Sequence, residues 1–273
     1  MTSIQISHTE IQTFLNILSY HQINLQGFRT IHLLTFIHKI LNYYKFNHTK
    51  DFFNTLQTNY DLVQNCKELL CYQQSEFFRD TSLWIQLKTQ FRKLQQQNEI
   101  NILFPRISTG EELYSLLIFL EEMNMLEKTN IVATEVCQNS LEQAKKGTYN
   151  LKTIQNLNKN WEEINISKPL TEYFEVAANL VNIKSYLKQK VNFHLQNIQN
   201  FYFADYSQYD IIWYRNQLIY WDVEAGNKHL TELTQKLKKG GMLILGYIED
   251  LYTYPIYQNF EIISIEDKIY KRK

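Results

Sequence analysis

The sequence predicts an α/β fold with a largely parallel sheet, preceded by a small all-helical domain. Two observations predict it. Over residues 11–70 the apolar residues recur at helical spacing around a single glycine, and after residue 99 short apolar runs alternate with helical stretches. Such alternation is typical of a doubly wound sheet, which binds its ligands at the carboxyl ends of the strands. We therefore expect an all-α domain over residues 1–70 and a second domain over 71–273.

The elements follow from the spacing of apolar residues. Residues 11–70 are expected to form a bundle of four short helices. In the second domain, strands are expected at residues 100–104, 130–136, 209–216 and 242–248, with one alternating strand over 260–272. Helices are expected at residues 111–124, 140–147 and 229–241, the last two each stopping at glycine. Residues 148–208 are less regular, and we interpret them as an insertion on the sheet.

Composition excludes several classes of function. Lys plus Arg equals Asp plus Glu at 28 each, so no net field would attract nucleic acid. The three cysteines and seven histidines lack metal-ligand spacing, so we expect no metal site. No apolar run approaches the ~18 residues of a membrane span, so we expect no membrane insertion. The N-terminus lacks the features of a secretory signal, which indicates a cytoplasmic protein.

A loop with the sequence STGEE joins the first predicted strand of the sheet to the helix that follows. Gly110 would let the backbone approach a ligand at the helix N-terminus, but Glu111 and Glu112 would repel a phosphate. Two carboxylates instead suit a ligand that carries positive charge and hydroxyls. In the alternative, which the loop alone favours, Ser108 or Thr109 caps the helix and the two acids complement its dipole.

A second acidic residue favours the interpretation of this loop as part of a ligand-binding site. Glu135 ends the next predicted strand 23 residues after Glu112, close to the ~20-residue spacing at which an acid in this fold binds a ribose. An adenosine-type ligand without a pyrophosphate fits both acids. S-adenosylmethionine, a sulfonium with an ammonium group, is the commonest such ligand.

Several motifs, taken in order along the whole chain, resemble those of the CheR-type methyltransferases, which methylate glutamates on chemotaxis receptors. The motifs are SEFFRD, STGEELYSL, ATEV with SLEQAKKGTY, YDIIWYRNQLIYWD and KKGGMLILGYIEDL. The resemblance implies a Rossmann-like methyltransferase sheet behind a small helical domain. It also implies S-adenosylmethionine as the cofactor, S-adenosylhomocysteine as the product, and a chemoreceptor or similar signalling protein as the partner.

The resemblance also assigns the cofactor-binding residues. Glu112 would face the amino-acid part of the cofactor, with Gly110 beside it, and Glu135 would bind the ribose hydroxyls. Residues at three further places complete the predicted site: Asn197 and Ile198 against the adenine, Arg215 and Asn216 at the end of the fourth strand, and Gln73, Ser75 and Arg79 in a linker over 71–99 that covers the cofactor.

Two side chains are expected at the methyl group, Arg79 and Tyr220. A glutamate is ionised at neutral pH, so its attack on the sulfonium methyl needs alignment and no general base. Arg79 would hold the incoming carboxylate and Tyr220 would orient it. The alternative for Arg79 is a surface ion pair with Asp80 or Glu76, and for Tyr220 it is core packing.

Two departures from the family keep other functions open. Pro105, Arg106 and Ile107 stand where the family has small residues, and their bulk could narrow the cofactor pocket. The helical domain is nearly neutral, which predicts weak attraction to an acidic receptor helix. A diverged, non-catalytic relative acting as an interaction module is therefore one alternative, and a methyltransferase for a different acceptor is another.

Overall fold

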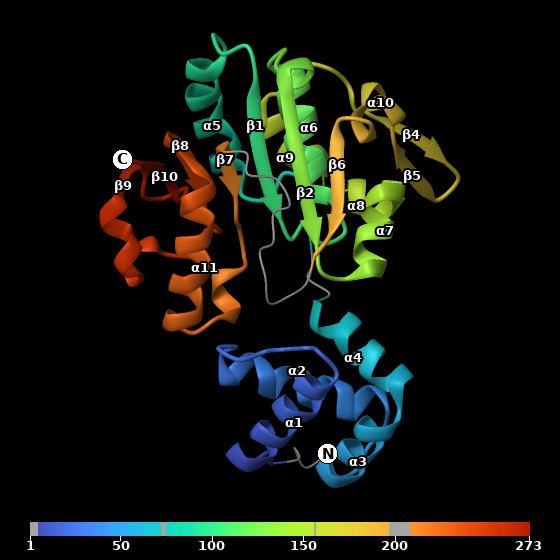
Figure 1. Cartoon of the computed structure of the whole chain (residues 1–273). Coiled ribbons are helices and arrows are strands. Elements are labelled where there is room, and N and C mark those ends of the chain that lie inside the picture. Colours follow the sequence, from blue (N-terminus) through green and yellow to red (C-terminus); the bar gives the residue numbers. More distant parts are fainter. Residues whose placement is uncertain (1–4, 72–74, 156, 197–207) are drawn as a thin grey trace.

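The computed structural model describes residues 5–71, 75–155, 157–196 and 208–273. A bundle of helices lies at one end of the molecule, and a sheet covered by helices forms the larger part (Figure 1). The bundle consists of α1 (His8–Tyr20), α2 (Thr30–Tyr43), α3 (Thr49–Thr58) and α4 (Tyr60–Cys71). The four helices predicted for this segment are thus confirmed.

The core of the bundle is rich in aromatic rings. The ring of Phe14 lies 5.8 Å from that of Phe36 and 6.1 Å from that of Phe52, between centroids. At the start of α1, the Ser7 hydroxyl accepts a hydrogen bond from the Glu10 N–H at 3.3 Å, and Glu10 Oε2 accepts one from the Ser7 N–H at 2.8 Å. This reciprocal cap fixes where α1 begins. Among the described residues, the core of the bundle is separate from the cores on the two faces of the sheet.

The main sheet is mostly parallel. Its order is β6-β2-β1-β7-β8-β10-β9, with parallel pairing from β6 to β8 and antiparallel pairing of β10 with both of its neighbours. The strands are β1 (Ile100–Pro105), β2 (Thr129–Glu135), β6 (Val191–Leu195), β7 (Tyr209–Trp213), β8 (Leu237–Ile244), β9 (Phe260–Ser264) and β10 (Ile269–Arg272). The predicted α/β class is therefore confirmed.

Helices cover both faces of this sheet. One face packs against α5 (Thr81–Leu94), α6 (Glu111–Glu122), α7 (Gln138–Lys146) and α9 (Leu157–Ile164), and the other against α11 (Val223–Lys236). Successive strand residues alternate between the faces, so Ile102 lies in the first core and Leu103 in the second. Helix α5 lies inside the segment predicted as a linker. Its Trp84 is fully buried against Trp213 of β7, with ring centroids 5.2 Å apart.

The irregular region between α7 and β6 forms a small antiparallel sheet of order β3-β5-β4. It contains β3 (Thr148–Asn150), α8 (Leu151–Gln155), β4 (Phe174–Ala177), β5 (Leu180–Ile183) and α10 (Ser185–Lys188). The run VNFHL then returns to the main sheet as its edge strand β6. The interpretation of residues 148–208 as an insertion on the sheet therefore holds for the small sheet of β3, β4 and β5, whereas β6 belongs to the main sheet itself.

Two predicted elements are wrong. The helix expected at 229–241 is α11, which starts earlier because Asp222 caps it by accepting a hydrogen bond from the Ala225 N–H at 2.9 Å. It also ends earlier, since Leu237 already pairs with Tyr209 and opens β8. The glycine pair therefore lies within a strand. A Cβ on Gly241 would come within 3.0 Å of the Asp210 carbonyl oxygen, so glycine there permits the close approach of β7 and β8.

The single strand expected at 260–272 is in fact the hairpin of β9 and β10. Between them Lys268 has a φ of 55°, and the Asp267 N–H donates to Ser264 Oγ at 3.1 Å. The apolar alternation runs through both strands, and the turn contains neither glycine nor proline. The pattern consequently hides the turn.

Candidate active site

The loop after β1 lies at the carboxyl edge of the sheet, where β1, β2 and β7 end. Gly110 is the N-cap of α6, with a φ of 94°, and a Cβ there would lie 2.9 Å from the Cβ of Ala144. Glycine is thus required by the left-handed backbone and by the contact of α6 with α7. The alternative in which Ser108 or Thr109 caps α6 is wrong, because the N-cap is Gly110 and no side chain at that position accepts a hydrogen bond from the first turn.

The two glutamates that open α6 have different surroundings, although both are buried. Glu111 Oε2 accepts a hydrogen bond from Thr109 Oγ1 at 2.5 Å, and burial raises the pKa of this carboxyl. Glu112 forms a buried ion pair with Arg215. Both acids also lie in the first turn of α6, where the helix dipole favours negative charge.

Glu135 ends β2 and is 1% exposed. Its Oε2 accepts a hydrogen bond from the Ser108 N–H at 2.7 Å, and its Oε1 accepts from the Val136 and Cys137 N–H groups at 2.7 and 3.0 Å. The carboxylate thereby ties the loop after β1 to the loop after β2. Oε2 has one acceptor position left with which to bind a hydroxyl.

Arg215 holds three segments together at the end of β7. Its side chain is 1% exposed, its two terminal nitrogens contact the carboxylates of Asp80 and Glu112, and its Nε donates to the Leu245 carbonyl at 3.2 Å. Burial lowers the pKa of Arg215, and the Asp80 carboxylate opposes that shift. Arg215 therefore links the segment before α5 to the start of α6. Asp80 was not among the predicted site residues.

Arg79 is the more accessible of the two neighbouring arginines, with 25% of its side chain exposed. Its Nη1 donates to Asn216 Oδ1 at 3.4 Å, and its Nε lies 3.7 Å from Glu76 Oε2. The ion pair with Glu76 was one of the alternatives for this residue, whereas Asp80 pairs with Arg215 instead. Its carbonyl oxygen accepts a hydrogen bond from buried Trp84 Nε1 at 2.9 Å, which anchors the backbone beneath the guanidinium.

Glu249, which was not among the predicted site residues, organises the loop after β7. It is 3% exposed. Its Oε2 accepts from the N–H groups of Gly246 and Asn216 at 2.6 and 2.8 Å, and its Oε1 accepts from those of Leu218 and Ile219 at 2.6 and 3.3 Å. Burial raises the pKa of Glu249, and these backbone bonds oppose the shift. The position of the Asn216 loop thus depends on one buried carboxylate.

Tyr220 lies in the short helix η3 (Leu218–Tyr220), which contacts the helical bundle. The Tyr220 carbonyl accepts a hydrogen bond from the Arg29 N–H at 2.9 Å, and His32 Nε2 lies 2.8 Å from the Ile219 carbonyl oxygen. The Tyr220 ring stacks on Phe28 with centroids 5.9 Å apart. Burial raises the pKa of Tyr220, so its hydroxyl is protonated at neutral pH and can donate a hydrogen bond.

The remaining predicted residues lie at or outside the edge of the described structure. Ser75 Oγ accepts a hydrogen bond from the Glu112 N–H at 3.1 Å and so contacts the start of α6. Gln73, Asn197 and Ile198 fall outside the described residues. The structure therefore brings together Ser75, Glu112 and Arg215 in one network, with Arg79 and Asn216 in a second contact beside it.

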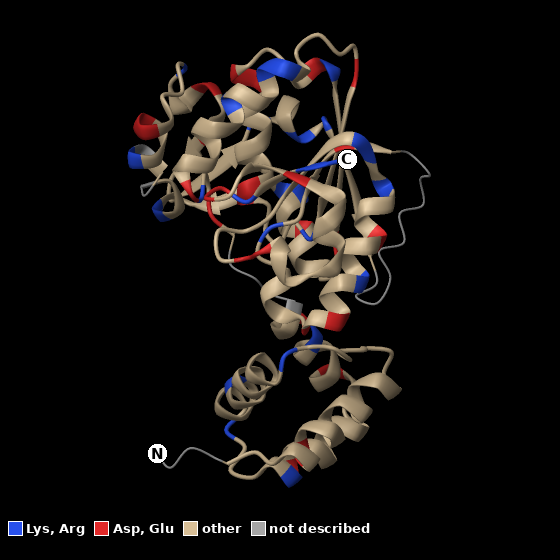
Figure 2. Cartoon of the chain, turned by 90° about the vertical axis from the view of Figure 1, so that its left-hand side faces the viewer, with Lys and Arg blue, Asp and Glu red and all other residues tan. Residues whose placement is uncertain are grey.

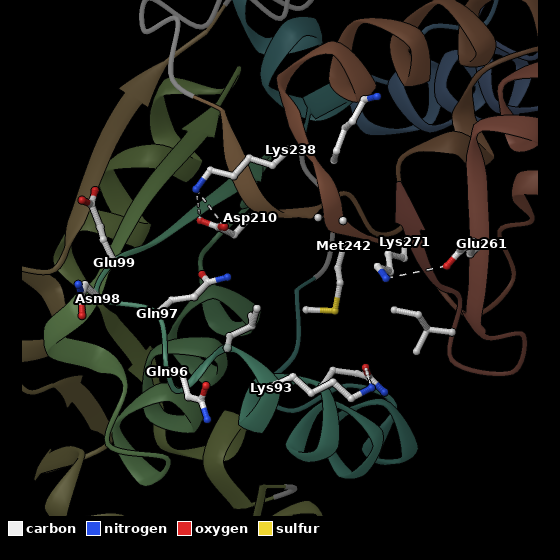
Figure 3. A pocket seen from close by; sticks show the side chains of 16 residues that line it. Lys93, Gln96, Gln97, Asn98, Glu99, Asp210, Lys238, Met242, Glu261 and Lys271 are labelled. Carbon is white, nitrogen blue, oxygen red and sulfur yellow. Dashed lines mark hydrogen bonds and ion pairs between the residues drawn. The ribbon is translucent and has the colours of Figure 1, made fainter. Parts of the chain in front are cut away.

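A pocket of about 1000 Å³ lies at the opposite edge of the sheet (Figure 3). Its lining includes Glu99, which precedes β1, Asp210 near the start of β7, and Lys238 near the start of β8. These are the amino ends of the parallel strands, and ligands of this fold bind at the carboxyl ends. We therefore do not assign the cofactor to this pocket.

The described part of the chain contains neither a cluster of metal-ligating side chains nor a membrane-spanning helix. No group of three or more His, Cys, Asp or Glu side chains there is arranged to hold a metal ion. No helix among these residues is long and apolar enough to cross a lipid bilayer.

A parallel α/β sheet with buried acids after its first two strands is typical of proteins that bind a nucleoside cofactor. A family described as CheR methyltransferase, SAM binding domain, matches residues 73–268. The chain belongs to this family of S-adenosylmethionine-dependent methyltransferases. The fold and cofactor expected from the sequence are thereby confirmed.

Three relatives show the extent of the similarity. The Cher3 protein of Pseudomonas putida is 27% identical over 72% of each chain. Chemotaxis protein methyltransferase 1 of Vibrio cholerae is 26% identical over 92% of each chain. The chemotaxis protein methyltransferase of Vibrio anguillarum is 33% identical over 53% of this chain and 52% of its own length. Together they support methyltransferase activity for this chain.

The described residues fit the cofactor chemically. Glu135 offers a carboxylate oxygen that can accept a ribose hydroxyl, and Glu111 and Glu112, the latter paired with Arg215, lie in the first turn of α6 at the same edge of the sheet. When bound, S-adenosylmethionine supplies a methyl group on positively charged sulfur. Of the three bulky residues before STGEE, Ile107 lies in the core with 1% exposure, so its side chain packs against protein.

Proposed function

We propose that this chain methylates glutamate side chains on a chemoreceptor-like protein, using S-adenosylmethionine and releasing S-adenosylhomocysteine. The family match and the relatives named as chemotaxis protein methyltransferases support the reaction class. We further propose that the reaction takes place in the cytoplasm and that residues 1–70 form the domain that meets the acceptor.

The observation that carries this proposal is the arrangement of Arg79. Its backbone is anchored to Trp84, its guanidinium is partly exposed, and it contacts Asn216 at the carboxyl edge of the sheet. Its positive charge also lowers the pKa of Tyr220, against the larger effect of burial, which raises it. A cation and a protonated phenol at the same edge of the sheet suit an incoming carboxylate.

The residues would act by alignment and electrostatics. When bound, S-adenosylmethionine would supply its methyl group to one oxygen of the acceptor carboxylate, and the electron pair of the broken carbon–sulfur bond would stay on sulfur. No proton is transferred, so no general base is needed. Arg79 would hold the carboxylate in line and Tyr220 would donate to its second oxygen. We propose that Glu249 and Asn216 fix the positions of the Arg79 guanidinium and the Tyr220 hydroxyl relative to each other.

The helical domain would bind the acceptor protein with little contribution from electrostatic attraction. Figure 2 shows few charged residues on its helices, and residues 1–70 contain five basic and four acidic side chains. We therefore expect acceptor binding to depend weakly on salt. The segment from Phe28 to His32 contacts η3, so this domain also bears directly on the position of Tyr220.

The test is methyl transfer to the cytoplasmic fragment of a chemoreceptor with radiolabelled S-adenosylmethionine, measured as base-labile methyl ester. Wild type should form the ester. Arg79→Ala should lower the rate at saturating cofactor about 100-fold or more, because it removes the group that aligns the carboxylate. Arg92→Ala, which removes an exposed arginine of α5, is the matched control and should be unchanged.

Cofactor binding must be followed in parallel by calorimetry. Normal binding without methyl ester on any receptor fragment would contradict the proposal. Undiminished transfer by Arg79→Ala would instead indicate an acceptor that needs no cation, and so a different substrate class.

A further inference from the structure

Arg106 is a buried arginine directly after β1, within the group of bulky residues that departs from the family. It is 7% exposed and has a φ of 60°, a left-handed conformation that residues other than glycine rarely adopt. The register of β1 on β7 pairs Leu103 with Ile212. Continued by three residues, it brings Arg106 level with Arg215. Arg106 therefore lies at the carboxyl edge, among the groups of the candidate site.

The guanidinium of Arg106 makes no hydrogen bond or ion pair with any residue of the described ranges, and its Nε is completely buried. Arginine keeps its charge in proteins, and a buried cation without an anion carries a desolvation penalty of several kcal/mol. Arg215, which is equally buried, is placed between two carboxylates. Among the described residues, Arg106 therefore lacks the carboxylate partners that Arg215 has.

The electrostatic surroundings show which way Arg106 faces. Burial raises the pKa of Tyr220, and Arg106 opposes that shift more than any other group does. Burial, followed by the charge of Arg106, lowers the pKa of His229 to about 4. Tyr220 lies in η3 and His229 lies in α11, and both of these elements follow β7 in the chain. The charges of Arg106 and Arg79 thus act in the same direction on the pKa of Tyr220, and that of Arg106 has the larger effect.

We propose that Arg106 binds a ligand carboxylate in the methyl-transfer site. Two carboxylates reach such a site, the one on the methionine part of the cofactor and the one on the acceptor glutamate, and the second source rests on the proposed function. A guanidinium can bind either through two parallel hydrogen bonds. The bulk that distinguishes this chain would then contribute to the binding site instead of closing it.

The experiment separates the two sources. Wild type, Arg106→Gln and Arg106→Lys are titrated with S-adenosylhomocysteine and with 5′-methylthioadenosine, which lacks the amino-acid part and its carboxylate. If Arg106 binds the cofactor, Arg106→Gln weakens S-adenosylhomocysteine about 10- to 100-fold and leaves methylthioadenosine unchanged. If it binds the acceptor, both nucleosides bind as in wild type and the KM for the receptor fragment rises by the same factor.

Arg106→Lys keeps the charge and should show a smaller loss than Arg106→Gln in whichever arm responds. Arg92→Gln is the control for removal of an exposed arginine and should match wild type in both arms. Removing an unpaired buried charge should leave the melting temperature of the free protein equal or higher, so a folding defect is not expected to hide the result.

Unchanged S-adenosylhomocysteine binding together with an unchanged KM would overturn the inference while leaving the proposed function intact. Conversely, a selective loss of S-adenosylhomocysteine binding would support it even if no receptor fragment is methylated. The two proposals can therefore fail separately.

Discussion

The two edges of the main sheet treat charge in opposite ways. At the amino edge, Lys238 pairs with Asp210 at 2.9 Å with 38% of the lysine side chain exposed, and Lys271 lies 3.9 Å from Glu261 with both side chains about half exposed. At the carboxyl edge, Glu112, Glu135 and Glu249 are each less than 10% exposed. The lysines of the first edge are about half exposed to solvent, whereas these three carboxylates of the second edge are buried.

This difference follows from the direction of parallel strands. Their carboxyl ends lead into helices whose N-terminal N–H groups, together with the loop N–H groups, face the same edge. A buried carboxylate there can be fully hydrogen-bonded by backbone, as Glu249 is. We infer that a charged side chain contributes to the stability of this molecule when backbone N–H groups or a second buried charge bind it. Exposed pairs should matter little.

The largest effect is expected at Glu249. Glu249→Ala leaves four backbone N–H groups without their acceptor, and at about 1 kcal/mol for each the free energy of unfolding should fall by about 4 kcal/mol. Urea unfolding measures this loss. Glu266→Ala, which removes an exposed acid, is the matched control. If Glu249→Ala were as stable as the control, the buried carboxylates at this edge would not contribute to the free energy of unfolding.

A pH dependence is expected at His229, which is buried beside Trp221 with ring centroids 4.4 Å apart. Burial, with the charge of Arg106, lowers its pKa from 6.5 to about 4. The unfolded chain therefore binds a proton that the folded one does not, and the stability present above pH 6.5 is lost as the pH falls towards 4. The loss should reach about 3 kcal/mol.

The measurement compares urea unfolding of wild type and His229→Gln from pH 7 to pH 4. The free energy of unfolding of His229→Gln should fall less steeply with decreasing pH than that of wild type. His8→Gln, at an exposed position of α1, should show the wild-type dependence. Parallel slopes for wild type and His229→Gln would argue against a neutral buried histidine at this edge.

The smallest effect is expected at the amino edge. Lys238→Ala removes a half-exposed partner of Asp210, whose Oδ2 still accepts a hydrogen bond from the Asn101 N–H at 2.8 Å. Stability should change by less than about 1 kcal/mol, and methyl transfer should be unchanged. A loss of activity here would remove the distinction between the two edges and would direct attention to the pocket in Figure 3.

Two site residues escaped the sequence analysis although both stand inside the motifs it used. Asp80 follows Arg79 in SEFFRD and was considered only as a partner of that arginine. Glu249 stands in GYIEDL, a few residues after the apolar run of β8, where an acid at the carboxyl end of a strand was a usable signal. In both cases the partner lies far away in the chain. Arg215 is 135 residues from Asp80, and spacing alone does not reveal such a pair.

The α/β class, the helical bundle, the central parallel strands and the acids after β1 and β2 could be predicted from the sequence, because these depend on local periodicity and on residues close in the chain. Tertiary structure alone decided which charges meet. Arg215 reaches Glu112 across 103 residues, and Tyr220 meets Arg29 of the helical bundle. Such contacts follow from how the sheet orders its strands, and local propensity carries no information about that order. For the same reason, only the fold shows that Arg106 is buried without a partner among the described residues.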